Sequence, residues 1–333
     1  MKQRADMTWA RRLAWLWLGV VVTVALSVPY LPLPYSPAVP DLAHIAAAPG
    51  STRHWLGTDA QGQDVLANLL FSTRTVVLLT LPAAALAALL GSLAGSIAGF
   101  WGNRLRVPLP YWLVALALTW TFLRLPGEGY ALALALLAAL AIIMQRRIRW
   151  RWPAFRLPLD TILLGSITVL GAVPRLLLVV AITSQGITAT GLIALLALLA
   201  WPEIARLVRA QMQRVRVLPF IEATQVAGIS SSRLWLRHAL PHALEPLRTA
   251  LPLSLAALIG LETTLSFLGV GLPPTVPSWG RMLAGARLNP SSYPSAIYPL
   301  ILLITTTVAL QTIATIPFII AHKYNNIKQL KTS

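Results

Sequence analysis

Long apolar stretches alternate along this chain with short polar segments that are rich in arginine. A helix needs roughly 20 mainly apolar residues to cross the hydrocarbon core of a bilayer, where its backbone must satisfy its own hydrogen bonds. The pattern predicts eight spanning helices, near residues 13–30, 75–100, 107–124, 129–145, 161–183, 187–206, 243–268 and 296–321. The third and fourth are short and joined by a tight turn at residues 125–128. We therefore expect an all-α, polytopic membrane protein.

The N-terminus resembles a signal peptide, because basic residues precede the apolar stretch 13–28. However, the proline-rich residues 29–34 follow it, without a small-x-small cleavage site. We expect this stretch to be kept as the first span.

Basic residues set the orientation of the spans, because Lys and Arg accumulate in cytoplasmic segments. Of the 27 Lys and Arg residues, 20 fall in segments placed inside if the N-terminus is inside, and five in segments placed outside. The other two, Arg175 and Arg248, fall within predicted spans. The distribution predicts that both termini lie in the cytoplasm.

Composition supports the membrane assignment, since 56% of the 333 residues are hydrophobic and only 11% are charged. The net charge of +17 comes from bursts between apolar runs and not from one basic face, which argues against a nucleic-acid partner and favours membrane lipid. The chain has no cysteine, which excludes disulfides, thiolate metal sites and a thiol nucleophile.

Motifs of catalysis are missing from the sequence. There is no GxxxxGK[ST] phosphate loop, HExxH, Cys/His cluster or GxSxG. We predict no catalytic residue, no metal ligand and no cofactor bound by this chain, so any energy must come from partners.

The polar loop between the sixth and seventh predicted spans, residues 208–241, has the pattern of two short helices. Pro219 is placed to open the first, and Gly228 can supply the positive φ that ends it. Ser230 or Ser231 can then cap the second. Their apolar residues, which need a surface to dock on, are Phe220, Ile221, Ala223, Val226, Leu234, Trp235 and Leu236. The alternative is an amphipathic loop on the anionic inner leaflet, attracted by Arg214, Arg216, Arg233 and Arg237.

The spacing within this loop resembles the EAA loop of the permeases of binding-protein-dependent ABC importers. The matching positions are Glu222, Ala223, Thr224, Gly228, His238, Leu240 and Pro241, with Thr224 in place of the third residue of the motif. The resemblance implies that the loop docks in a cleft of a cytoplasmic ATPase and couples ATP-driven closure to movement of the spans.

Flanking motifs narrow the resemblance to permeases for dipeptides, oligopeptides and nickel. Their HxxGTDxxGRDV signature is matched at His54, Gly57, Thr58, Asp59, Gly62 and Asp64. Residues 201–209, 237–242 and 265–283 match further motifs in the same order. Positions that depart from the family pattern are Gln63, Asn68, Ser72, Gly165, Thr168 and His242. Short peptides are the expected substrate, with nickel or a metal chelate as the alternative.

The resemblance implies an organisation and a set of partners. The expected regions are the first span with its cytoplasmic segment (1–30), a periplasmic segment (31–74), a permease domain (75–322) and a cytoplasmic tail (323–333). A six-span core would be interrupted by an inserted hairpin at 104–158. The expected partners are a second homologous permease, two cytoplasmic ATP-binding subunits that use ATP and Mg, and an external substrate-binding protein, all at a bacterial inner membrane.

Ionisable residues within spans are functional candidates. Glu262, Thr263 and Ser266 could line the translocation path, or Glu262 could instead pair with an arginine such as Arg175. Glu203 is expected to pair locally with Arg206 or Arg209. The spans are otherwise nearly free of ionisable groups, which argues against an ion-coupled secondary transporter, and no interfacial constellation supports an enzyme acting on lipid. Gly91, Gly95 and Gly99 form a ladder typical of close helix packing.

Overall fold

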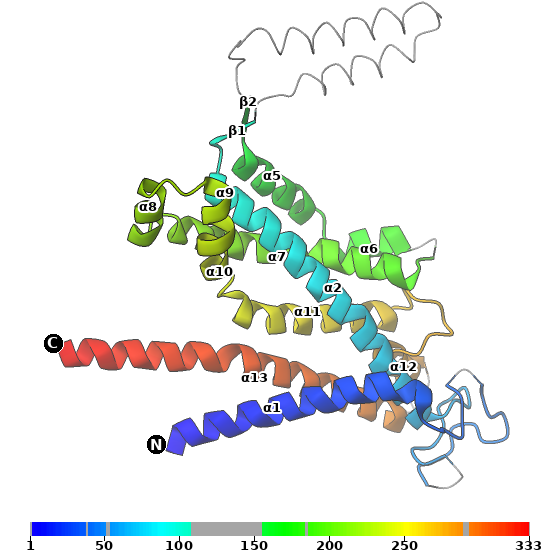
Figure 1. The fold of residues 1–333 in the computed structure, drawn as a ribbon. Helices are drawn as coiled ribbons and strands as arrows, with labels where there is room; N and C mark the ends of the chain where they lie inside the picture. Colours follow the sequence, from blue (N-terminus) through cyan, green and yellow to red (C-terminus); the bar gives the residue numbers. More distant parts are fainter. Residues whose placement is uncertain are drawn as a thin grey trace, which may run out of the picture. The chain divides into compact units, whose positions relative to one another are not determined.

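The structure is a computed structural model, and it describes residues 2–37, 39–50, 54–107, 155–183, 186–288 and 293–332. The chain divides into two compact units, one of residues 1–100 and 166–333 and the other of residues 101–165, and each is described by itself. Helices form almost all of the regular structure described in the larger unit (Figure 1).

Five helices in the described residues are long and apolar enough to cross a membrane. They are α1 (Lys2–Ser27, continued by the 3-10 turn η1, Val28–Tyr30), α2 (Val65–Trp101), α7 (Ala189–Val215), α11 (Leu247–Phe267) and α13 (Tyr293–Thr332). They confirm the first, second, sixth, seventh and eighth predicted spans. Four run well beyond the predicted bounds: α1 begins at Lys2, α2 begins at Val65, α7 continues to Val215 and α13 continues to Thr332.

The fifth predicted span, residues 161–183, is not one continuous helix. It is broken into α5 (Leu159–Ala172) and α6 (Arg175–Thr183), which together provide a sixth candidate span. Pro174 explains the break, because proline donates no backbone hydrogen bond and disfavours helical geometry at the residue before it.

The third and fourth predicted spans fall on residues 108–145, outside the described residues, so the eight-span count stays a prediction. The segments that flank this region pair as two short antiparallel strands, β1 (Leu105–Val107) and β2 (Phe155–Leu157). Leu105 faces Leu157 and Val107 faces Phe155 across the ladder. The all-α prediction missed these strands, and it assigned Val107 to a helix.

The glycine ladder of α2 packs against α7. A Cβ atom at Gly91, Gly95 or Gly99 would lie 2.8, 2.4 or 2.8 Å from the carbonyl oxygen of Trp201, Ala205 or Arg209, respectively. Both helices advance together through these contacts, so they run parallel with their backbones in close approach. The predicted packing role of the ladder is confirmed.

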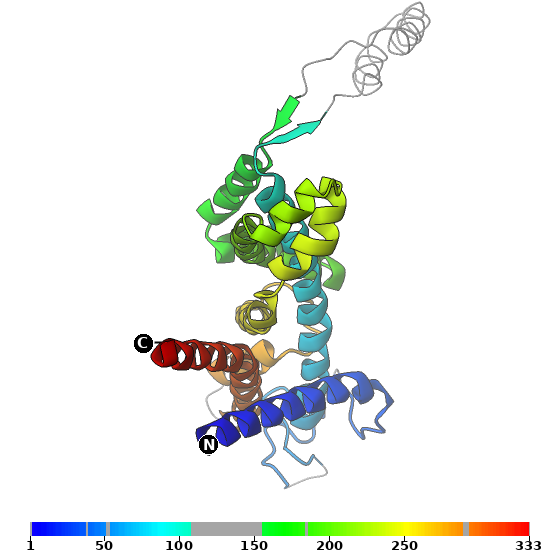
Figure 2. The same ribbon diagram turned by 60° about the vertical axis from the view of Figure 1, so that its left-hand side comes forward.

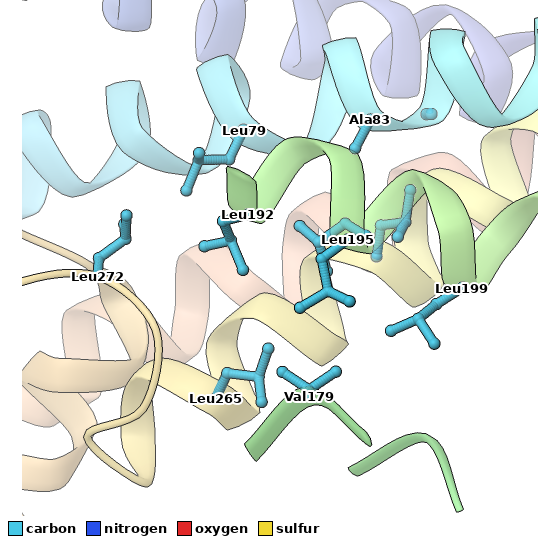
Figure 3. Close-up of a cluster of buried hydrophobic side chains, with 11 residues drawn as sticks. Leu79, Ala83, Val179, Leu192, Leu195, Leu199, Leu265 and Leu272 are labelled. Carbon is cyan, nitrogen blue, oxygen red and sulfur yellow. The ribbon is translucent and has the colours of Figure 1, made fainter. Parts of the chain in front are cut away.

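A cluster of leucines forms the main apolar core of the larger unit (Figure 3). It joins α2, α6, α7, α11 and the loop after α11, and its labelled members are Leu79, Ala83, Val179, Leu192, Leu195, Leu199, Leu265 and Leu272. Lipid tails are as apolar as leucine, so in a membrane this core stabilises the fold by packing more than by the hydrophobic effect.

The first and last spans lie side by side, as Figures 1 and 2 both show. Ala14 of α1 packs with Ala309 and Ile313 of α13. The indole Nε1 of Trp17 donates a hydrogen bond to Thr306 Oγ1 at 3.2 Å. Helix α13 also packs against α11, which links the two ends of the chain to its centre.

Candidate functional site

The loop after α7 folds into the two predicted short helical segments. The first, α8 (Pro219–Val226), begins at the predicted proline, and Gly228 follows it with a φ of 78°. The second runs through α9 (Ser231–Leu234), a π-helical turn η2 (Trp235–Ala239) and α10 (Leu240–Ala243). Ser230 precedes the second segment, but its side chain makes no capping hydrogen bond, so the predicted side-chain cap is wrong. At the start of this segment, the backbone N–H of Leu234 instead donates a hydrogen bond to the Ser230 carbonyl.

The apolar residues of this loop divide into an anchored set and an outward set. Ile221 of α8 and Leu234 of α9 are fully buried, and the rings of Phe220 and His242 lie 5.4 Å apart. In contrast, the side chains of Val226 and Leu236 are 89% and 57% exposed. The loop therefore has a fixed shape with apolar side chains turned away from its own chain.

The motif residues of the loop mostly lie on its exposed side. Glu222, Ala223, Gly228 and Pro241 are exposed, and Thr224, His238 and Leu240 are half-buried. No neighbouring atom would meet a Cβ at Gly228, so only its positive φ demands glycine there.

The loop is tied to two membrane helices. It continues directly from α7, and α10 packs back against α7. At its entry, Arg216 Nη1 donates a hydrogen bond to the carbonyl of Phe100, in the last turn of α2, at 3.1 Å. The C-terminal carbonyls of a helix lack partners within the helix and carry partial negative charge, so an arginine there is favourable.

A second candidate site lies in the N-terminal loop (residues 31–64), where the HxxGTDxxG-like motif folds around His54. His54 is buried, with Nδ1 2.8 Å from Asp64 Oδ1 and Nε2 3.3 Å from Asp41 Oδ2. Tyr35 stacks on its ring at a centroid distance of 3.9 Å. Asp64 also accepts from Ala67 N–H at 2.7 Å, which caps the start of α2. Sequence reasoning missed Asp41 and Tyr35, because no periodic pattern relates them to the motif.

The remaining motif residues hold turns of the same loop. Gly57 and Gly62 both have a φ of 78°, and a Cβ there would meet the carbonyl oxygens of Ala47 and Asp41 at 2.2 and 2.6 Å. Thr58 Oγ1 accepts from Ala47 N–H at 2.9 Å and donates to the His44 carbonyl. Asp59 accepts from Gln61 and Gln63 N–H groups at 2.9 and 2.8 Å. All six motif positions therefore serve the local fold.

Two acids of the N-terminal loop are shifted in opposite directions. Hydrogen bonds from His44 and His54 lower the pKa of Asp41 from 3.8 to about 2. Burial raises the pKa of Asp59, and the two backbone donors oppose that rise. The loop thus combines a strongly stabilised surface carboxylate with a partly desolvated one.

The loop after α11 folds around Arg281 of α12 (Trp279–Leu288). Its guanidinium donates to the carbonyls of Leu272, Pro273, Pro274 and Val276. Burial lowers the pKa of Arg281, while the charge of Glu262 opposes that shift. Next to it, Gly280 lies so close to α11 that a Cβ would be 2.1 Å from the Thr263 carbonyl oxygen. These contacts hold the α11 end, the loop and α12 together.

The predicted pathway residues lie inside this packing. Glu262, Thr263 and Ser266 are buried, and Ser266 Oγ donates to Glu262 Oε1 at 2.7 Å. Arg175 instead forms an exposed ion pair with Glu203 at 2.5 Å. The suggested pairing of Glu262 with Arg175, and the local pairing of Glu203 with Arg206 or Arg209, are therefore wrong.

A cavity of about 370 Å³ lies between the N-terminal loop and α12. Its lining includes Asp59, Gln61, Asn68, Ser278 and Arg281. Asn68 and Gln63, which both depart from the family pattern, line this cavity, and Asn68 Nδ2 donates a hydrogen bond to Gln63 Oε1 at 2.8 Å. A third, Ser72, contacts Met282 Sδ at 3.7 Å.

Spanning helices, a motif-bearing loop at one end of α2 and a shaped helical loop at the other end define a multi-pass membrane transport subunit. The family model described as "Binding-protein-dependent transport system inner membrane component" matches residues 151–321. This chain belongs to that family, and it is an inner-membrane permease component of an ABC importer. That assignment sets aside the secondary transporter and the lipid enzyme.

Similar curated proteins come from several bacteria. A putative peptide permease protein of Brucella suis is 29% identical over 255 residues, covering 77% of this chain and 67% of that protein. A probable peptide ABC transporter permease of Sinorhizobium fredii is 36% identical over 142 residues, covering 42% of this chain and 48% of that protein. The oligopeptide transport system permease protein OppC of Bacillus subtilis is 24% identical over 294 residues, covering 87% and 78%.

Proposed function

We propose that this chain is one of two permease subunits of a peptide importer, and that it receives the work of ATP through the loop at residues 208–241. A second homologous permease would complete the translocation path. Two cytoplasmic subunits would bind ATP and Mg, and an external binding protein would deliver the substrate. The chain would bind no nucleotide itself.

The shape of the loop is the observation that carries this proposal. Ile221 and Leu234 anchor it, whereas Val226, Leu236 and Glu222 are exposed. Exposed apolar side chains on a fixed scaffold favour docking with a partner protein. A loop lying on the inner leaflet would also expose apolar groups, but it would not require the left-handed Gly228 between its helices.

Di- and oligopeptides are the proposed substrates. The support is the HxxGTDxxG-like motif, together with the names of the relatives from Brucella suis, Sinorhizobium fredii and Bacillus subtilis. Nickel or a metal chelate remains the alternative from the same motif. Uptake of labelled peptides and of ⁶³Ni by cells carrying the complete transporter would separate the two.

The proposed organisation keeps 75–322 as the permease domain, interrupted at 104–158. The paired strands β1 and β2 support an insertion, because they bring its two ends together. Glu262, Thr263 and Ser266 are proposed to act near the path by holding the α11 end, since all three are buried within this chain.

Copurification tests the assembly. The chain is expressed with its neighbouring gene products and purified through a tag on this chain alone. We expect a nucleotide hydrolase to copurify and to hydrolyse ATP faster when the binding protein and peptide are added. A preparation that contains the second permease but no hydrolase would contradict the proposal.

Gly228→Ala tests the coupling loop with little change in bulk. The Cβ would meet no neighbour, so the cost is the left-handed φ, about 1–2 kcal/mol applied to the local fold. We expect peptide uptake to fall several-fold while the chain still reaches the membrane. Gly186→Ala is the matched control, because Gly186 also has a positive φ and open space around it but lies after α6. Equal effects of both variants on uptake would contradict a special role for Gly228.

A further inference from the structure

Helix α7, which leads into the cytoplasmic loop, contacts the last three turns of α2. Gly91, Gly95 and Gly99 contact α7 at Trp201, Ala205 and Arg209, so the contacts begin beside Pro202 and end near the loop. Pro202 removes one backbone hydrogen bond from α7, which weakens that helix locally. The portion of α7 between this proline and the loop is therefore supported along one side by α2.

Close approach makes this support stiff. Glycine at three successive turns lets the two backbones approach closely. Ile204 and Met212 of α7 fill the space beside Gly91 and Gly99, with their Cβ atoms 2.8 Å from where a glycine Cβ would stand. Relative sliding would drive these side chains into the backbone of α2.

Arg216 links α7 and α2 at their cytoplasmic ends. It is the residue that follows α7, and its guanidinium reaches across to the Phe100 carbonyl of α2 at 3.1 Å. The bond is charge-assisted and partly buried, and its acceptor is a carbonyl in the last turn of α2. It thus joins the first residue after α7 to a second membrane helix.

We propose that α2 and the cytoplasmic half of α7 move as one body during transport, and that Arg216 is the positioning residue that transmits displacement of the loop to α2. This inference rests on the proposed coupling function of the loop. The glycine contacts end at Met212, so without the Arg216 bond part of the displacement of α8 and α10 would be lost in bending between Met212 and α8.

The test uses the complete transporter in proteoliposomes. For Arg216→Ala we expect near wild-type ATP hydrolysis, peptide uptake at least threefold slower, and a correspondingly higher number of ATP molecules consumed per peptide. Arg216→Lys keeps a cationic donor and should recover at least half of the lost uptake. Arg214→Ala removes the same charge from an exposed side chain two residues earlier, and it should leave the number of ATP molecules consumed per peptide unchanged.

A distance measurement keeps the proposal testable even if Arg216→Ala assembles poorly. This chain has no cysteine, so spin labels can be placed on Leu93→Cys in α2 and Arg206→Cys in α7, both exposed positions. We expect the same interspin distance with and without a trapped ATP analogue. An ATP-dependent change in that distance, or an unaltered ratio of ATP to peptide in Arg216→Ala, would overturn the inference.

Failure of the inference can be told apart from failure of the proposed function. If Gly228→Ala reduces uptake and Arg216→Ala does not alter the ratio, only the transmission through α2 is wrong. If no hydrolase copurifies and Gly228→Ala has no effect, the coupling function itself is wrong.

Discussion

His54 shows how single residues organise the N-terminal loop. The motif that contains it was found from spacing, whereas its partners Asp41 and Tyr35 precede the motif by more than ten residues in a proline-rich stretch. Contacts of that kind depend on the path of an irregular loop, which apolar periodicity does not encode. The structure therefore assigns the motif a local structural role that its spacing alone did not indicate.

The acid response of this loop follows from Asp41. Its pKa of about 2 lies below the ordinary 3.8, because His44 and His54 bond the carboxylate. A carboxyl whose pKa is lowered by folding stabilises the fold fully above its unfolded pKa, and that contribution is lost as pH falls through the folded pKa. We expect the N-terminal loop of the wild type to lose protection from pepsin between about pH 4 and pH 2.

The Asp41→Asn variant supplies the control, because it lacks the titrating group and is digested by the same enzyme at each pH. Its cleavage should be faster than that of the wild type at pH 4, and the difference should shrink towards pH 2. Parallel cleavage profiles of the two proteins across this range would show that Asp41 does not stabilise the loop.

At the scale of elements, the spanning helices were the most predictable part. Apolar runs located α1, α2, α7, α11 and α13, because a bilayer requires long uninterrupted helices. The apolar runs did not predict the start of α2 or the end of α7, since both helices extend beyond these runs into polar sequence. Pro174 could have been used to break the fifth span, and the β1–β2 ladder was missed because three-residue strands carry too little pattern.

The junction of α11 and α12 provides a matched pair of glycines. At Gly280 an added Cβ would lie 2.1 Å from the Thr263 carbonyl oxygen, whereas at Gly285, in the same helix, it would meet nothing within 4 Å. We expect Gly280→Ala to destabilise the protein by about 1–3 kcal/mol, through strain between backbones. Gly285→Ala should be neutral or stabilising by up to about 1 kcal/mol, because alanine favours the helix.

Thermal unfolding of both variants in detergent measures this difference. Because the loop after α11 depends on Arg281, which follows Gly280, we also expect Gly280→Ala to expose residues 269–278 to protease. Unfolding temperatures that agree within error for the two variants would contradict the close packing of α11 and α12.

At the scale of the whole molecule, the paired strands predict that the insertion can be removed. Val107 faces Phe155, so residues 108–154 can be replaced by an Asn-Gly turn that closes a two-residue hairpin. We expect the shortened chain to reach the membrane, assemble with its partners and support uptake at a rate within about threefold of wild type, because a local hairpin replaces the whole insertion.

The control is a shortened chain with scrambled residues in place of the Asn-Gly turn, which tests whether the turn that joins β1 and β2 matters. If the Asn-Gly chain assembles but transports nothing, the insertion has a function in transport. If it does not assemble, the core needs the insertion, and the proposed organisation of residues 75–322 is wrong.

The family and the class of protein were predictable from the sequence, because motif spacings survive where overall identity is low. The helical shape of the loop after α7 was also predictable, from Pro219 and Gly228. The bond from Arg216 to Phe100 was not, since the two residues are 116 positions apart and an arginine next to a loop has many potential acceptors. The clamp of Arg281 on four carbonyls was missed for the same reason.

Site-specific cross-linking from Val226 tests whether the loop after α7 docks on an ATP-binding subunit. A photoreactive side chain at this exposed position of the cytoplasmic loop should cross-link to the ATP-binding subunit in native membranes, and the same group at the exposed Trp55 should not. ATP trapping should change the yield at Val226, because the loop would follow closure of the ATPase dimer. Cross-links from Val226 to lipid alone, in membranes that contain the assembled transporter, would contradict docking of the loop on the ATP-binding subunit.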